Sequence, residues 1–229
     1  MAKIMLGSLA GAISGALGND VFSHNRHGAY VRRRVIPTKV TNAYTIEARN
    51  ILAAAAQGWG LLSAEQQATW NTWAKSHPIT DRLGQKQELF GAGAYTQINA
   101  RILRSGDTYI EAPSAASAPS PLTALSGVAS EATQAVTLTF AATPLAATER
   151  LWVQAALLVK PGVNYYKNLL KLVAVSPLAE ASTLVITTEI AARFGNFLAG
   201  HRFVVMAAVY ESTSGLLSSP MLAEFTAGA

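Results

Sequence analysis

The side chains able to do chemistry in this sequence are few and scattered. His24 and His27 stand three residues apart, but their neighbours are basic and no third metal ligand follows closely. The acidic residues form no D-x-D or H-E-x-x-H pattern, no serine lies in a G-x-S-x-G turn, and there is no cysteine. The sequence therefore predicts no catalytic residue, no metal ligand and no cofactor, and we expect a protein that is not an enzyme.

The strongest electrostatic feature is the run Arg32-Arg33-Arg34. Basic residues outnumber acidic ones by 12 to 7 in residues 1–112, but the two are equal, 6 and 6, in residues 113–229. In a strand Arg32 and Arg34 would share one face and Arg33 would take the other. The run can contact phosphates of a nucleic acid without reading its sequence, or pair with a protein partner. We favour the protein partner, because no helix-turn-helix, zinc-finger or RNP pattern accompanies the arginines.

The first forty residues hold the expected partner-binding residues. Residues 4–18 form an apolar stretch rich in Gly and Ala, which is shorter than the ~20 residues that a membrane span needs. Glycine at every fourth position also disfavours a helix, so we expect an extended or looped arm and no membrane contact. The arm and the basic segment after it give the candidate set Gly7, Gly11, Gly15, Arg26, Tyr30, Arg32, Arg33, Arg34 and Lys39.

Turn formers and caps place the elements of the first half. Residues 25–28 supply turn formers between Val21-Phe22 and a second set of apolar residues, Tyr30, Val31, Val35 and Ile36, which sit among basic ones. This pattern predicts a β-hairpin ended by Pro37. Three helices are predicted next, over residues 43–57, 64–76 and 89–104. Thr41 and Asn42 are candidate caps for the first, and Ser63 with Gln66 matches a capping box for the second. We expect these helices to pack around Trp70 and Trp73.

The second half has the alternating pattern of strands. Residues 112–121 contain only Ala, Pro and Ser, a composition typical of a flexible linker. Beyond them about seven strands are predicted, with one helical turn within residues 190–198, a count typical of an immunoglobulin-like or fibronectin-type-III-like sandwich. The expected fold is α+β and multi-domain, with an arm, a hairpin and short helices in residues 1–111, the linker in 112–121 and an all-β sandwich in 122–229. Tyr165 and Tyr166, in the loop before Lys171, are weak candidates for contact with a partner or a sugar.

Several small motifs of the first half occur in a recognisable order. They are Gly15-x-x-Gly18, Val21-Phe22-Ser23, Asn25-Arg26-x-Gly28-x-Tyr30-x-Arg32, Pro37, Arg49, Trp59, Leu62-Ser63-x-x-Gln66-x-x-x-Trp70 and Ala74. In this order residues 7–104 resemble a family of mostly uncharacterised proteins from tailed bacteriophages and from bacterial genomes with phage-like genes. The resemblance implies a structural component of a virion, and it transfers no activity and no functional residue.

The resemblance and the residues together give three functional hypotheses. The first is a non-enzymatic virion protein associated with the capsid, neck or tail, which docks on other virion proteins through its arm and basic hairpin and forms a homo-oligomer in a symmetric assembly. The second is a sequence-independent nucleic-acid-binding protein that uses Arg32 to Arg34. The third is a surface carbohydrate-binding module.

Overall fold

The computed structural model describes residues 2–3, 13–25, 28–36, 42–80, 85–141, 145–160 and 162–229. The chain divides into two compact units, residues 1–46 and residues 47–229. The Ala/Pro/Ser stretch lies inside the second unit, where residues 113–121 carry neither helix nor strand.

The first unit is a small antiparallel sheet. Its strands are β1 (Ala2–Lys3), β2 (Gly15–Leu17), β3 (Asp20–Asn25) and β4 (Gly28–Arg33), in the order β1-β4-β3-β2. The predicted hairpin is confirmed, because β3 pairs with β4 from Asp20↔Arg33 to Asn25↔Gly28. Its second strand ends at Arg33 rather than at Ile36. The reason is that the partner strand β3 begins only at Asp20, after the turn at Gly18 and Asn19 that connects it to β2. The last contact is the Arg34 N–H, which donates to the Asn19 carbonyl at 2.6 Å.

Three helices follow the small sheet along the chain: α1 (Ala43–Trp59), α2 (Ala64–Ser76) and α3 (Gly91–Arg104). All three predictions are confirmed to within about two residues. The capping box forms as predicted, since Ser63 Oγ accepts the Gln66 N–H at 3.2 Å and Gln66 Oε1 accepts the Ser63 N–H at 2.8 Å. Asn42 caps α1 by accepting the Thr45 N–H at 2.8 Å, whereas Thr41 lies outside the described residues. The short strands β5 (Ile79–Thr80) and β6 (Lys86–Gln87) pair between α2 and α3.

Trp70 is the centre of the helical core. It is fully buried, packs edge-on against Tyr95 with ring centroids 5.4 Å apart, and donates its indole N–H to the Glu111 carbonyl at 2.7 Å. Trp73 is only partly buried, and its ring stacks on His77 at 4.0 Å, so the expectation that both tryptophans are core holds fully for Trp70 alone. Ala55 is the only buried residue of α1.

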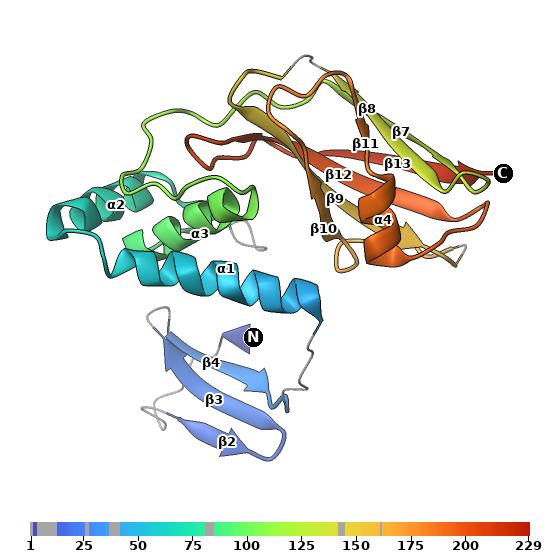
Figure 1. Cartoon of the computed structure of the whole chain (residues 1–229). Helices are drawn as coiled ribbons and strands as arrows, with labels where there is room; N and C mark the ends of the chain where they lie inside the picture. The colour runs from blue at the N-terminus through green and yellow to red at the C-terminus, as the bar shows by residue number, and fades with distance from the viewer. Residues whose placement is uncertain are drawn as a thin grey trace. The chain divides into compact units, whose positions relative to one another are not determined.

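The rest of the second unit is a seven-stranded sheet with one helix, as Figure 1 shows. The strand order is β10-β9-β12-β13-β7-β8-β11, with all neighbours antiparallel except β13 and β7. The number of strands agrees with the predicted count of about seven. They are β7 (Ala124–Ser130), β8 (Ala135–Ala141), β9 (Glu149–Leu158), β10 (Lys171–Val175), β11 (Thr183–Val185), β12 (Arg202–Glu211) and β13 (Met221–Gly228). The helix α4 (Thr187–Phe194) has eight residues and starts before Ile190, so it is earlier and longer than the single turn expected.

The sheet curls so that its two halves enclose one core. Alternate residues of β9 and β12, such as Val153 and Val205, meet Leu138 of β8 and Leu184 of β11, while Ile190 of α4 closes the same cluster. The chain is therefore α+β, with a curled seven-stranded sheet in its second half.

The helical segment meets the sheet through α3, whose Ile98 and Ile102 share a buried cluster with Tyr210 of β12. Tyr210 of β12 is fully buried in the same cluster as Trp70, Tyr95 and Ile98, and Trp152 of β9 packs against that cluster. The helical segment and the curled sheet consequently share a core within the second unit.

Candidate partner-binding surface

The first unit contains most of the residues that the sequence singles out, and none of its described side chains is buried. Val21, Phe22 and residues 28–31 are half-buried, and the others that the structure describes between residues 13 and 46 are mostly exposed. A sheet of this size ordinarily needs one covered apolar face for stability. Among the described residues of this sheet, neither face carries a buried side chain.

The arginine run divides between the two faces of the sheet. Arg32 lies opposite Val21 on the face that also carries Tyr30, whereas Arg33 lies on the other face, opposite Asp20. Arg34 follows the last residue of β4, and its N–H still donates to the Asn19 carbonyl. All three arginines are exposed, and none forms an ion pair with a described residue.

Other members of the candidate set are only partly placed. Gly15 pairs with Phe22 at the start of β2 and has φ +112°, a conformation that L side chains rarely adopt. Tyr30 is half-buried and lies between Ser23 of β3 and Lys3 of β1. The remaining members, Gly7, Gly11, Arg26 and Lys39, lie outside the described residues.

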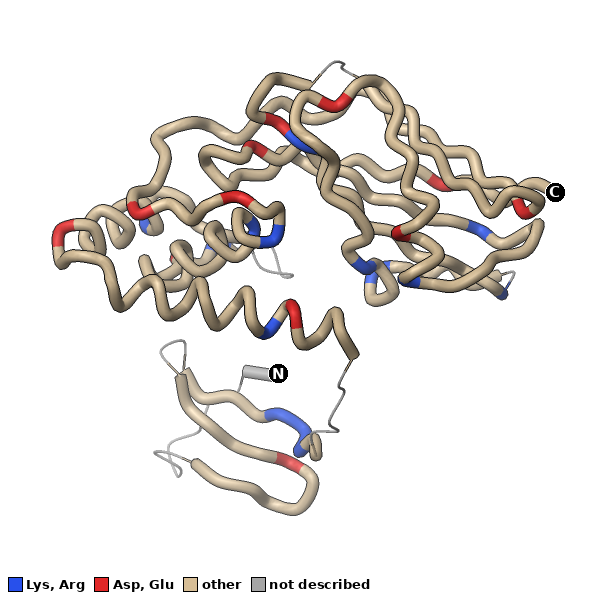
Figure 2. The backbone as a smooth tube through the Cα atoms, in the orientation of Figure 1, with Lys and Arg blue, Asp and Glu red and all other residues tan. Residues whose placement is uncertain are grey.

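The net positive charge lies in the first of the two units. Residues 1–46 contain six basic residues and one acidic residue, Asp20, whereas residues 47–229 contain twelve of each. The net charge of +5 therefore belongs entirely to the first unit. Figure 2 shows basic positions at the end of β4 and both signs of charge spread along the second unit.

No metal centre is assembled among the residues that the structure describes. His24, exposed in β3, pairs with Ala29, and His27 falls outside the described ranges. In the described part of the chain, no helix is both long and apolar enough to cross a membrane.

A polar network that includes the fully buried Tyr210 lies at the helix–sheet junction. Arg150 donates to Asp107 Oδ1 at 2.9 Å and to the Ser176 carbonyl at 3.2 Å. Ser105 Oγ lies 2.8 Å from Asp107 Oδ2 and 3.1 Å from the phenol oxygen of Tyr210. Burial raises the pKa of Tyr210 to about 12, although the hydrogen bond with Ser105 opposes the shift. The network connects the residues that follow α3 to β9 and β12, so its role is to hold the fold together.

Tyr210 should be among the last tyrosines to ionise. Its unfolded-state pKa is 10.0, so the unfolded chain loses this proton first as the pH rises. Protonated Tyr210 contributes about 2–3 kcal/mol to the free energy of unfolding. This contribution is fully present below pH 10 and is lost between pH 10 and about 12. Urea unfolding across this range should show the decline, and Tyr210→Phe should flatten it. An identical pH profile for the two proteins would contradict the assignment.

A shallow apolar pocket of about 110 Å³ lies on the outer face of β9 and β12. Its lining includes Trp152, Met206, Leu217 and Pro220, and its polar side chains are Gln154 and Ser218. Neither is a general acid or base, so the pocket offers contact surface rather than reactive groups.

The lysines of the loop between β9 and β10 were not predicted as part of a site from the sequence. The loop drew attention only through Tyr165 and Tyr166, which the structure separates: Tyr165 is 60% exposed, whereas Tyr166 packs on the sheet. The signal that could have found it is the segment from Lys160 to Lys171, which has three lysines and no acidic residue.

Comparison with known proteins adds little to this geometry. No family model and no curated protein matches the sequence. Among solved structures, the chain is similar to a Fn3-like protein from Clostridium thermocellum, with 17% identity and a TM-score of 0.32 over 49% of this chain and 97% of that one.

Proposed function

We propose that this chain is a non-enzymatic structural protein of a larger assembly, in which residues 1–46 dock on neighbouring subunits. The observation that carries the proposal is the first unit itself, a sheet with no buried side chain among its described residues. Isolated small sheets without a covered face are marginally stable. A partner surface that covers one face would supply the missing apolar contact.

The strand order gives a means of docking. The sheet ends in β1 on one side and β2 on the other, and both edge strands are short. An edge strand presents backbone N–H and C=O groups to which a strand of another subunit can pair. Arg32 and Arg33, on opposite faces, can then form charge-assisted hydrogen bonds on either side of the joint.

The kind of assembly comes from the sequence resemblance. Residues 7–104 resemble the tailed-phage family in the order of their small motifs, so the proposed assembly is a virion, with the protein repeated as a homo-oligomer in its capsid, neck or tail. Symmetric repetition suits a docking arm, because each subunit then both gives and receives one contact.

The proposal extends to the fold of residues 122–229, which we assign to an immunoglobulin-like or fibronectin-type-III-like sandwich. One half of the curled sheet contains β7, β8 and β11, and the other contains β9, β10, β12 and β13. Core residues drawn from both halves support a two-layer arrangement of this kind.

Removing residues 1–41 should abolish incorporation into particles and leave the second unit folded, because Asn42 remains to cap α1. The substitution of Arg32, Arg33 and Arg34 together by alanine should reduce incorporation at least tenfold. Mass spectrometry of purified particles measures the copy number. A matched control replaces the exposed cations Arg49, Lys75 and Lys86, which lie outside the first unit. Full copy number in the truncated protein would overturn the docking role.

Nucleic-acid binding by the same unit is the second candidate. It is favoured by the concentration of the whole +5 charge in 46 residues, because phosphate binding depends on local positive charge. A salt-dependent shift of labelled DNA that the arginine triple variant loses, with unchanged incorporation into particles, would favour this candidate over docking.

A further inference from the structure

The segment from Val159 to Lys171, which we call the lysine loop, joins β9 to β10 and has two different sides. Its inner side is apolar: Val163, Tyr166 and Leu170 pack on Ala156, Leu158 and Val204, which are buried on the outer face of β9 and β12. The loop is thus fixed to the sheet by a small core of its own.

Polar contacts also hold the loop. Arg202 of β12 donates to the Val163 carbonyl at 2.6 Å and to the Asn164 side chain at 3.2 Å. The Leu169 and Leu170 N–H groups both donate to the Tyr166 carbonyl, which closes a turn. These bonds preorganise the backbone, so a ligand would not have to order it.

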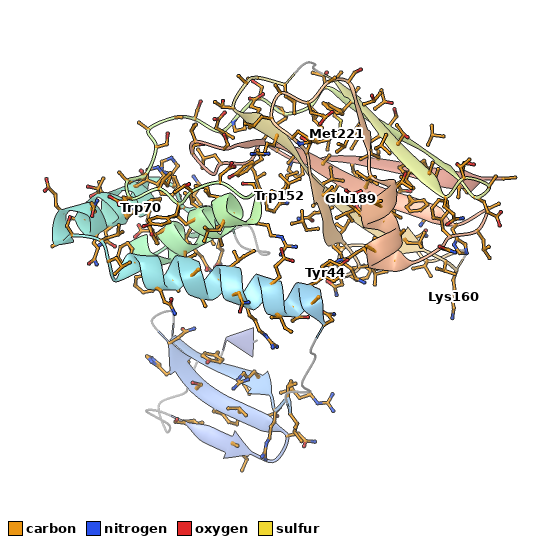
Figure 3. All side chains as sticks on the ribbon, in the orientation of Figure 1. Tyr44, Trp70, Trp152, Lys160, Glu189 and Met221 are labelled. Atoms are coloured by element: carbon orange, nitrogen blue, oxygen red, sulfur yellow. The ribbon has the colours of Figure 1, made fainter. Side chains whose placement is uncertain are left out.

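The outer side of the lysine loop combines cations with exposed apolar groups. Lys160, Lys167 and Lys171 are exposed, and none forms an ion pair with a described residue. Tyr165 is 60% exposed and Leu169 is 43% exposed. Figure 3 shows Lys160 pointing away from the sheet. Lys171 is partly engaged, because its Nζ lies 5.1 Å from the centre of the Phe194 ring.

We propose that the lysine loop binds an acidic polysaccharide. The exposed ring of Tyr165 can stack on the C–H face of a sugar, and Leu169 extends that apolar contact. The lysines can bind carboxylate groups carried by the same or neighbouring sugars. A neutral sugar would leave the three lysines without a role.

The charge balance favours a polysaccharide over a nucleic acid at this site. The second unit has equal numbers of acidic and basic residues, so it lacks the broad positive field that a densely charged phosphate backbone requires. A polymer with one carboxylate per sugar has a lower charge density, which three lysines can match. This inference does not rest on docking by residues 1–46, because the loop belongs to the other unit.

Binding of the full-length protein to polygalacturonate, compared with neutral dextran, tests the proposal by isothermal titration calorimetry. The wild type should bind polygalacturonate with an affinity that falls as salt rises. Tyr165→Ala should weaken binding about tenfold, and Lys160→Ala with Lys167→Ala should weaken it by a similar factor. Matched controls are the exposed Tyr109→Ala and Lys75→Ala, which should bind like the wild type.

The arginine triple variant separates the two units in this experiment. Its binding to polygalacturonate should be unchanged, whereas its incorporation into particles should fall. Loss of binding in that variant but not in the loop variants would overturn the proposal. Equal binding to dextran, or tighter binding through the loop to oligo(dT) or to phosphatidylglycerol vesicles, would also overturn it in favour of a neutral sugar, a nucleic acid or a lipid surface.

Discussion

Replacing Trp70 by alanine should lower the free energy of unfolding of the second unit by about 4 kcal/mol, more than any other single truncation in the helical segment. The indole is fully buried and contacts both Trp73 and Tyr95 edge-on. The substitution leaves a cavity and also removes the donor to the Glu111 carbonyl, which is 2.7 Å away. Urea denaturation followed by far-ultraviolet circular dichroism measures the change.

Trp73→Ala is the matched control for this prediction. The residue has the same type and lies in the same helix, but it is only partly buried and its ring also stacks on the exposed His77. Its loss should therefore cost about 1–2 kcal/mol. Equal effects of the two substitutions would mean that Trp70 is not the centre of the helical core.

Local sequence signals predicted the elements well because each element depends on neighbouring residues. The turn formers in residues 25–28 predicted the hairpin, the Ser63 and Gln66 pair sets the start of α2, and alternating apolar residues set the seven strands. Helix faces were less predictable. The residues of α1 are rich in alanine, and a face of small side chains gives a periodic pattern whether or not another element covers it.

The junction between the helices and the sheet could not be predicted from local pattern. Ser105 and Tyr210, which lie 3.1 Å apart there, are separated by 105 residues in the chain. The Ala/Pro/Ser composition of residues 112–121 suggested separation, yet Tyr210 and Trp152 belong to the same cluster as Trp70. Composition describes the backbone of a connection, but it carries no information on whether the elements at its two ends share a core.

The candidate surface was predictable in its composition but not in its geometry. The exposed arginines of β4 lie where the sequence placed them, but the end of the strand at Arg33 depends on where β3 turns. The lysine loop required the structure, because only the packing of Val163 and Tyr166 shows which side of the loop is free. In a sequence without an alternating or helical period, inner and outer residues look alike.

Gly215→Ala should destabilise the second unit by about 3 kcal/mol, because this glycine sits where the chain between β12 and β13 touches α3. Its φ of +68° strains any L residue, and a Cβ there would lie 2.6 Å from Ile98 and 3.1 Å from Ile102. Arg101 also donates to the Gly215 carbonyl, at 3.4 Å. The added methyl group would therefore clash with side chains of α3 at the junction between the helices and the sheet.

Gly200→Ala isolates the backbone part of this effect. Gly200 has φ +84°, but a methyl group added there would meet nothing within 4 Å, so its substitution should cost only about 1 kcal/mol. All four tryptophans of the chain belong to the junction cluster or pack against it, so their fluorescence reports on this region rather than on the sheet core. In urea, Gly215→Ala should lower the fluorescence midpoint more than Gly200→Ala does. Equal shifts would contradict the close approach of Gly215 to Ile98 and Ile102.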